Sequence, residues 1–315
     1  MSNTREDAYK RMVDRFYAIT AIYRRFNGNK IQDKRNEIAT DILNKVNKGG
    51  KIQDYVLYLR PFSTSGQLAM MQDYQIARRR LISARSALLQ QEMSELQVYL
   101  LGDMELQFAD ALWSSRLPLV ALLEIDRDEQ GQGAGRIQEK FGDDWLCYVS
   151  KLAEKAKGII VTLVSDGGVS GQGTINEIQM LRNKELLDKT LFFVPVLTDG
   201  SNQKSFQKEW KETRTIILNQ IGISLPNFQP DDFFHIKGYF LKYVTEYSIF
   251  VEIPVDSFIK MHFPWEINNP LNNIIDGTIL MNLILLNSYN VNNLRGDSIK
   301  LSLGNNINIE AKVYR

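Results

Sequence analysis

The chain has 315 residues, a net charge of +1 and 44% hydrophobic residues, a composition typical of a folded protein with one large domain or a core domain with smaller additions. The near-zero charge creates no overall field for nucleic acid or for an anionic membrane, so we expect neither as a partner. The single cysteine excludes an internal disulfide. Together with only two histidines, it offers too few ligands for a His/Cys zinc site, so we expect no metal. The N-terminus lacks the apolar core of a signal peptide, and we expect a cytoplasmic protein.

Two amphipathic helices are predicted at the N-terminus. Apolar residues recur at helical spacing over residues 5–26 and 31–47, and glycines end both segments. An amphipathic stripe normally marks a buried face, so we assign residues 1–50 to a helical hairpin that serves packing or oligomerisation.

Strands alternate with helices between residues 51 and 237. Apolar runs predict strands at 55–59, 117–123, 159–164, 191–197 and 233–236, and amphipathic segments predict helices at about 73–99, 103–114, 144–157, after 173, and at 203–220. This alternation predicts an α/β domain with a parallel, doubly wound sheet. Pro195 cannot donate a hydrogen bond to a neighbouring strand, so its strand is expected to lie near an edge or to be broken there.

Three loops follow predicted strands and should share one rim of the sheet, where ligands bind in such folds. The first begins at Arg60, and the second is a polar loop over residues 124–138 that Gly131, Gly133 and Gly135 should make mobile. The third, residues 165–173, holds four glycines between the most apolar strand and the helix that carries Glu177. A glycine-rich loop lets a ligand approach the backbone, so Glu177 is the first candidate for catalysis.

Residues 238–315 lack this alternation and are rich in Asn and Ile. A helix is predicted near 273–286, and strands are predicted at 298–303 and 307–314. We assign this C-terminal region to a small accessory module whose role the residues do not indicate.

The motif order between residues 52 and 237 resembles that of bacterial Toll/interleukin-1 receptor-like (TIR-like) domains. The motifs are YVLYLRPF, DMELQFADAL, a strand, the GAGR loop, DDW before a helix, GIIVTLV and GTINEI. The resemblance implies a flavodoxin-like fold and a role in anti-phage defence. Active members cleave the nicotinamide–ribose bond of NAD with a glutamate on the helix after the third strand, and Glu177 occupies that place. NAD would be the substrate, and no cofactor is implied.

One departure concerns the position four residues before the glutamate. Active TIR-like members often carry a tryptophan there, and this chain has Gly173. The spelling Gly173-Thr174 followed by Glu177 is similar to the loop of nucleoside 2-deoxyribosyltransferases, whose glutamate attacks the anomeric carbon of a sugar. Both relatives act on an N-glycosidic bond, so a nucleoside or nucleotide substrate stands beside NAD.

The chemistry of that bond suits a site with one carboxylate. Cleavage develops positive charge on the sugar, which a nearby carboxylate stabilises or traps covalently. Thr174 either caps the helix or touches the sugar, since threonine is a favoured N-cap residue. The alternative for Glu177 is a solvated glutamate on a helix surface.

Other candidate substrate-binding residues lie on the predicted rim. Arg60 and Arg136 carry paired N–H donors that suit a pyrophosphate, and the alternative is an ion pair with Asp143, Asp144 or Glu105. The neighbouring Pro61 and Gly133 would shape these loops. Phe62 and Trp145 are candidates to stack on a base, although Trp145 at the start of a helix also suits the core.

The remaining hypothesis is a non-catalytic TIR-like module that signals by assembly. Both terminal extensions offer contact surfaces, so we expect a homo-oligomer or a complex with a regulatory protein of a defence system.

Overall fold

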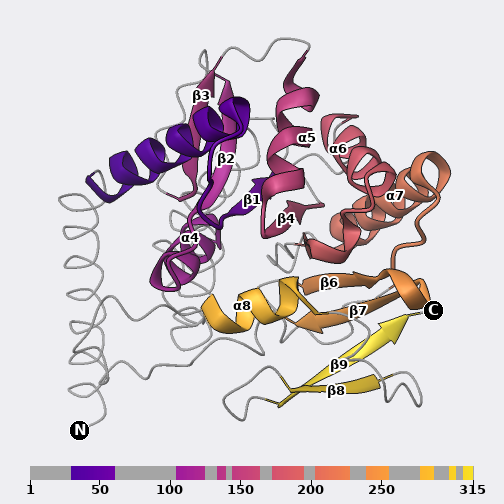
Figure 1. Ribbon diagram of the computed structural model, residues 1–315. Helices are drawn as coiled ribbons and strands as arrows, with labels where there is room; N and C mark the ends of the chain where they lie inside the picture. The colour runs from indigo at the N-terminus through magenta and orange to yellow at the C-terminus, as the bar shows by residue number, and fades with distance from the viewer. Residues whose placement is uncertain are drawn as a thin grey trace, which may run out of the picture.

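The structure is a computed structural model, and it describes residues 30–60, 104–124, 133–139, 144–163, 172–194, 203–227, 239–254, 277–286, 298–302 and 308–314. Nine strands within these residues form one mixed sheet in the order β3-β2-β1-β4-β5-β6-β7-β9-β8 (Figure 1). The strands are β1 (Val56–Leu59), β2 (Leu119–Glu124), β3 (Gly135–Glu139), β4 (Gly158–Thr162), β5 (Thr190–Val194), β6 (Tyr239–Val244), β7 (Ile249–Pro254), β8 (Ser298–Ser302) and β9 (Asn308–Tyr314).

The first five strands in sequence form the parallel half of the sheet. β3, β2, β1, β4 and β5 lie side by side and all pair in parallel. β1, β4 and β5 are buried along their whole length, which explains why their sequences are continuous apolar runs with no polar alternation. The α/β class and the alternation predicted for this part of the chain are confirmed.

The other half of the sheet is antiparallel. β6 pairs antiparallel with β5, and β7, β9 and β8 continue outward in the same manner. The helix and the two strands predicted in the C-terminal region are confirmed as α8 (Gly277–Ile284), β8 and β9. The region that we assigned to an accessory module therefore extends the central sheet.

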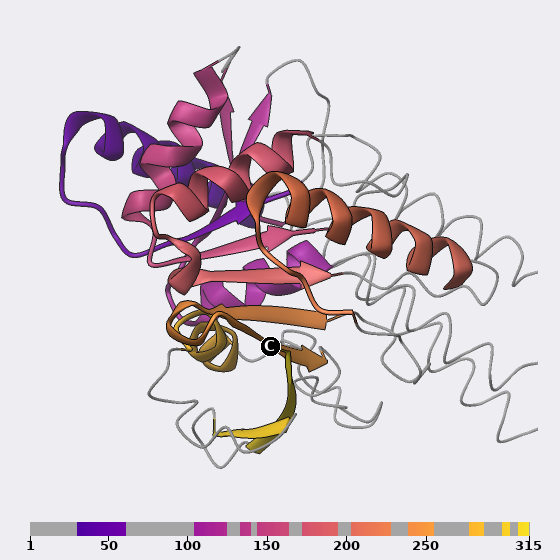
Figure 2. The ribbon, with the colours of Figure 1, turned by 90° about the vertical axis from the view of Figure 1, so that its right-hand side faces the viewer.

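Helices cover both faces of the sheet. One face is covered by four helices of the described part of the chain: residues 30–48, α5 (Trp145–Lys155), α6 (Gln172–Asn183) and α7 (Gln203–Ile221) (Figure 2). Their apolar side chains share one cluster with Leu57, Ile159 and Val161. α4 (Met104–Ser114) and α8 pack together on the other face, over Val56, Ile160 and Phe193. The second helix of the predicted hairpin is thus a core element of the α/β layer, while residues 1–29 lie outside the described part of the chain.

The main difference from the prediction is β3. The polar segment 124–138 was expected to be a loop, yet residues 135–139 pair in parallel with β2 as a strand. The helix over 30–48 packs behind this strand, because Ala39, Ile42 and Leu43 join Ile137 in one apolar cluster. The predicted strand over 191–197 ends at Val194, before Pro195, which agrees with a break there. The strand predicted at 233–236 and the helix at 73–99 lie outside the described residues.

Candidate functional site

Glu177 lies in the second turn of α6, the helix that follows β4. The helix packs against α5 and α7, and Ile175 and Ile178 anchor it in the apolar cluster on that face. Glu177 shares the buried side of the helix, and its side chain is only 1% exposed. The alternative of a solvated surface glutamate is therefore wrong for this position.

The carboxyl group of Glu177 is buried, and its Oε2 atom has no hydrogen-bond partner among the described residues. Burial raises the pKa of this carboxyl well above its usual value, and no charge in the described part of the chain opposes it. The neutral, protonated form of Glu177 is thus the favoured one in the structure as it stands.

Thr174 shares this environment. It lies three residues before Glu177 on the same helix, a spacing that places the two side chains on one face. It is 2% exposed, and its Oγ1 atom has no hydrogen-bond partner among the described residues. Thr174 lies inside α6, which begins at Gln172, so the described contacts show no N-capping bond from its hydroxyl. Two buried polar atoms one turn apart, neither satisfied by described atoms, leave hydrogen bonds that a ligand or a water molecule would supply.

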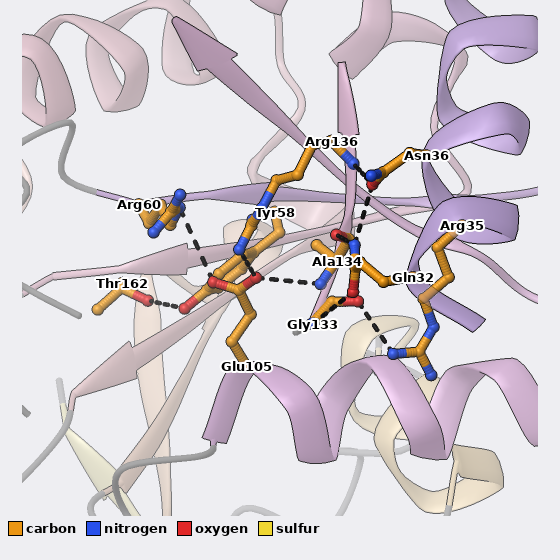
Figure 3. Close-up of polar contacts among 10 residues, drawn as sticks. All are labelled: Gln32, Arg35, Asn36, Tyr58, Arg60, Glu105, Gly133, Ala134, Arg136 and Thr162. Atoms are coloured by element: carbon orange, nitrogen blue, oxygen red, sulfur yellow. Dashed lines mark hydrogen bonds and ion pairs between the residues drawn. The ribbon is translucent and has the colours of Figure 1, made fainter. Parts of the chain in front are cut away.

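A second polar cluster surrounds Glu105, in the first turn of α4 on the opposite face of the sheet (Figure 3). Its Oε1 atom accepts a hydrogen bond of 3.0 Å from the Ala134 backbone N–H and forms an ion pair with Nη2 of Arg136. Its Oε2 atom lies 3.8 Å from Nε of Arg60. Burial opposes the ionisation of Glu105, but the attraction of Arg136 and Arg60 outweighs it and lowers the pKa below its usual value.

Gly133 makes this close approach possible. A Cβ atom on Gly133 would lie 2.4 Å from Oε1 of Glu105, closer than any real contact. Gly133 and Gly135 are both buried, and residues 135–139 form β3 where a loop was predicted. Gly131 lies outside the described residues.

Side chains of the 30–48 helix hold the same segment in place (Figure 3). Gln32 accepts a hydrogen bond of 2.8 Å from the Gly133 N–H and donates one of 2.8 Å to the Ala134 carbonyl. Asn36 accepts a hydrogen bond of 2.8 Å from the Arg136 N–H. These amide groups satisfy the outer edge of β3 as a neighbouring strand would, and they explain why a polar, glycine-rich segment forms an ordered strand.

Tyr58 and Thr162 complete the floor of the cluster. Their hydroxyl groups lie 3.0 Å apart, joining β1 to β4 near the carboxyl ends of both strands. Burial, followed by the nearby negative charge of Glu105, raises the pKa of Tyr58 to about 12. The phenol therefore stays neutral and serves as a hydrogen-bonding group at physiological pH.

The structure divides the predicted site residues into two groups. Arg60, Gly133 and Arg136 meet around Glu105, and the ion pair that we weighed as the alternative for both arginines is present with Glu105 as the partner. Glu177, Gly173 and Thr174 belong to α6 on the other face. Within the described residues no hydrogen bond or ion pair joins Glu177 to the cluster around Glu105.

The remaining candidates add little to either group. Trp145 begins α5 and packs against the apolar cluster of that face, as expected for a core residue. Pro61 and Phe62 lie outside the described residues. Glu105 was predicted only as a possible ion-pair partner of the arginines, and the parts of Tyr58, Thr162 and Gln32 were not predicted. One signal was present: Tyr58 and Arg60 are two residues apart on a strand and therefore face the same side of the sheet.

Comparison with other classes of site gives negative findings. Among the described residues, no three His, Cys, Asp or Glu side chains are grouped so as to bind a metal ion. None of the helices in the described ranges combines the length and the apolar character needed to cross a membrane. Comparisons of the chain with protein-family models, with curated proteins and with solved structures found no match.

Proposed function

We propose that this protein cleaves an N-glycosidic bond with Glu177 as the catalytic carboxyl. The observation that carries the proposal is the burial of Glu177 beside Thr174, with both polar ends unsatisfied by the described residues. A buried carboxyl with a perturbed pKa and no structural partner is typical of a functional group, because it destabilises the fold unless a ligand uses it.

The topology supports a ligand site next to this helix. The parallel strands have the order β3-β2-β1-β4-β5, with α4 on one face and α5, α6 and α7 on the other, which is the 3-2-1-4-5 order of a doubly wound sheet. It differs from the expected 2-1-3-4-5 flavodoxin order because β3 adds a parallel strand beside β2. In a doubly wound sheet of this order the strand order reverses between β1 and β4, and ligands bind outside the carboxyl ends of these two strands. α6 is the helix that follows β4, and Glu177 lies in its second turn.

The reaction breaks the bond between the anomeric carbon and the base nitrogen, and the base leaves with the bonding electron pair. Water adds to the anomeric carbon and loses a proton. In NAD the leaving nicotinamide is neutral, so it needs no proton, and Glu177 would act in its ionised form to stabilise the positive sugar. The positive charge of a bound pyridinium would itself favour ionisation of the nearby carboxyl.

The raised pKa of Glu177 favours a second substrate class as well. A neutral nucleoside releases its base more readily when a proton is donated to it, and a protonated carboxyl is the donor that such a step requires. NAD and neutral nucleosides therefore predict opposite pH dependences. Cleavage of NAD should rise as Glu177 ionises, and cleavage of a nucleoside should fall.

The TIR-like resemblance adds the biological setting to the proposal, namely NAD depletion in anti-phage defence by an oligomer or by a complex with a regulatory protein. A TIR-like module without catalytic activity remains the contrasting possibility, since Gly173 replaces the tryptophan that active members often carry.

The test is release of a free base from NAD and from nucleosides, measured by chromatography for the wild type and for Glu177→Gln. Glu177→Gln keeps the shape of the side chain and removes its ionisation, so turnover should fall by at least about 100-fold, the scale of acid–base catalysis. Glu185→Gln, on the exposed turn after α6, is the matched control and should retain full activity. Equal turnover by wild type and Glu177→Gln would contradict the proposal.

A further inference from the structure

The cluster around Glu105 has the composition of an oxyanion site. Two guanidinium groups, on Arg60 and Arg136, and the backbone N–H of Ala134 converge on one position. Paired guanidinium groups and backbone N–H donors are the groups with which proteins bind phosphate and carboxylate. The site also adjoins the N-terminus of α4, where the helix dipole favours negative charge. In the structure the carboxylate of Glu105 occupies this position.

Arg136 provides an independent indication that the ion pair with Glu105 leaves donors of the site unsatisfied. Its side chain is 2% exposed, and its Nε and Nη1 atoms have no hydrogen-bond partner among the described residues. Of its side-chain donors, Nη2 alone has a partner within the described ranges, namely Glu105 in the ion pair. A guanidinium group this deeply buried normally satisfies most of its N–H groups, since an unsatisfied buried donor is destabilising.

The position is within reach of a ligand. Arg60 follows β1 directly and is 13% exposed, so the cluster meets the surface at Arg60, while Glu105 is buried behind it. This is the same rim on which ligands bind in doubly wound sheets. On the inner side, Tyr58 and Thr162 close the floor with hydroxyl groups.

We propose that Arg60, Arg136 and the Ala134 N–H form a binding site for a phosphoryl group, and that Glu105 is an internal competitor that fills the site when the ligand is absent. The ligand must displace the Glu105 carboxylate to bind. The site is thus self-blocked, and its affinity depends on how readily Glu105 leaves. This inference does not depend on the role of Glu177, which lies on the opposite face of the sheet.

The test is to remove the competitor and to measure anion binding to the full chain. Glu105→Ala empties the position, and Asp110→Ala is the matched control. Asp110 lies on the same helix and pairs with Arg35, which donates to the Gly133 carbonyl at the border of the cluster. Both variants change the net charge equally. Isothermal titration with pyrophosphate, inorganic phosphate and acetate, at constant ionic strength, provides the readout.

We expect Glu105→Ala to bind pyrophosphate at least about tenfold more tightly than the wild type, because a like charge within the site has been removed. Asp110→Ala should bind as the wild type does, and the second substitution in Glu105→Ala/Arg136→Gln should abolish the gain. If Glu105→Ala is too unstable to titrate, its melting temperature should rise with phosphate concentration and not with chloride.

Three results would overturn the proposal. Equal affinities of wild type and Glu105→Ala would show that Glu105 blocks nothing. An equal gain in pyrophosphate affinity in Asp110→Ala, or a gain that persists after Arg136→Gln is added, would show that the gain comes from the overall charge. A gain with acetate alone would show that the position accepts only a carboxylate, and that Glu105 is a structural residue there.

Discussion

Replacing Glu177 by glutamine should stabilise the protein at neutral pH, although it removes the proposed catalytic group. Glutamine has nearly the same shape as protonated glutamic acid and cannot ionise. The wild-type carboxyl is 1% exposed, and burial raises its pKa well above the value of an exposed glutamate. The folded protein therefore holds a proton on Glu177 over a pH range in which the unfolded chain has released it.

The sign of the effect follows from this proton. A group whose pKa is raised in the folded state contributes stability that is fully present below the unfolded-state pKa and is lost as the pH rises through the folded-state pKa. Between these two values, the free energy of unfolding falls by about 1.4 kcal/mol per pH unit, the free energy that corresponds to one proton. Glu177→Gln has no ionisable group at this position, so it lacks this pH-dependent loss of stability. The two proteins should be similarly stable near pH 4, and the variant should gain on the wild type by that slope as the pH increases.

The assay is urea unfolding followed by circular dichroism at several pH values from 4 to 8, with the difference between the two proteins plotted against pH. The two proteins differ only at residue 177, so this difference reports the contribution of Glu177. Glu185→Gln, on an exposed turn, is the matched control for the Glu-to-Gln substitution. If Glu177→Gln is less stable than the wild type at pH 7, or if the difference does not change with pH, then Glu177 is ionised and has a partner in the folded protein, and the reasoning fails.

Two further predictions concern packing on the α8 side of the sheet. Lys242 is fully buried, and its Nζ donates to the carbonyl of Asp188 and, at 2.7 Å, to that of Ile284 at the end of α8. Lys242→Met should lower the free energy of unfolding by about 2–5 kcal/mol, because both carbonyls lose their donor. Urea unfolding measures this loss of stability. The control is Lys184→Met, which removes an exposed ion pair and should change the free energy of unfolding by less than about 1 kcal/mol. Equal losses in Lys242→Met and Lys184→Met would refute the argument. A Cβ on Gly158 would lie 2.4 Å from Cγ2 of Ile284, so Gly158→Ala should lower stability by about 1–3 kcal/mol. Ile284→Leu removes that methyl group at constant volume. In a double-mutant cycle, Gly158→Ala should therefore lower the free energy of unfolding less in the Ile284→Leu background than in the wild type. Strictly additive losses of stability would contradict the proposed clash.

The buried strands of the parallel half were predictable from local sequence. β1, β4 and β5 lie between two helical layers, so both of their faces are apolar and the sequence shows continuous apolar runs. The helices between them were equally readable, because each buries only one face. β8 and β9 were also found from their strand-like composition, although their place in the sheet was not.

β3, β6 and β7 depended on tertiary contacts. β3 is mostly polar, and Gln32 and Asn36, about 100 residues earlier in the chain, bind the backbone of Gly133 and Arg136 at its start. No local pattern records such a partnership. β6 contains the buried Lys242, whose charge is satisfied by carbonyls from two other segments, and a lysine in an apolar run weakens the prediction of a buried strand.

The sequence by itself indicated Glu177, because a glycine-rich loop between a buried strand and a helix is a local feature. It also placed Arg60 at the end of its strand for the same reason. Only the tertiary structure decided that Glu177 is buried without a described partner, and that Arg60 and Arg136 converge on Glu105 from three separate elements. Periodicity reports which face of an element is apolar, whereas the pairing of charges is set by which elements the fold brings together.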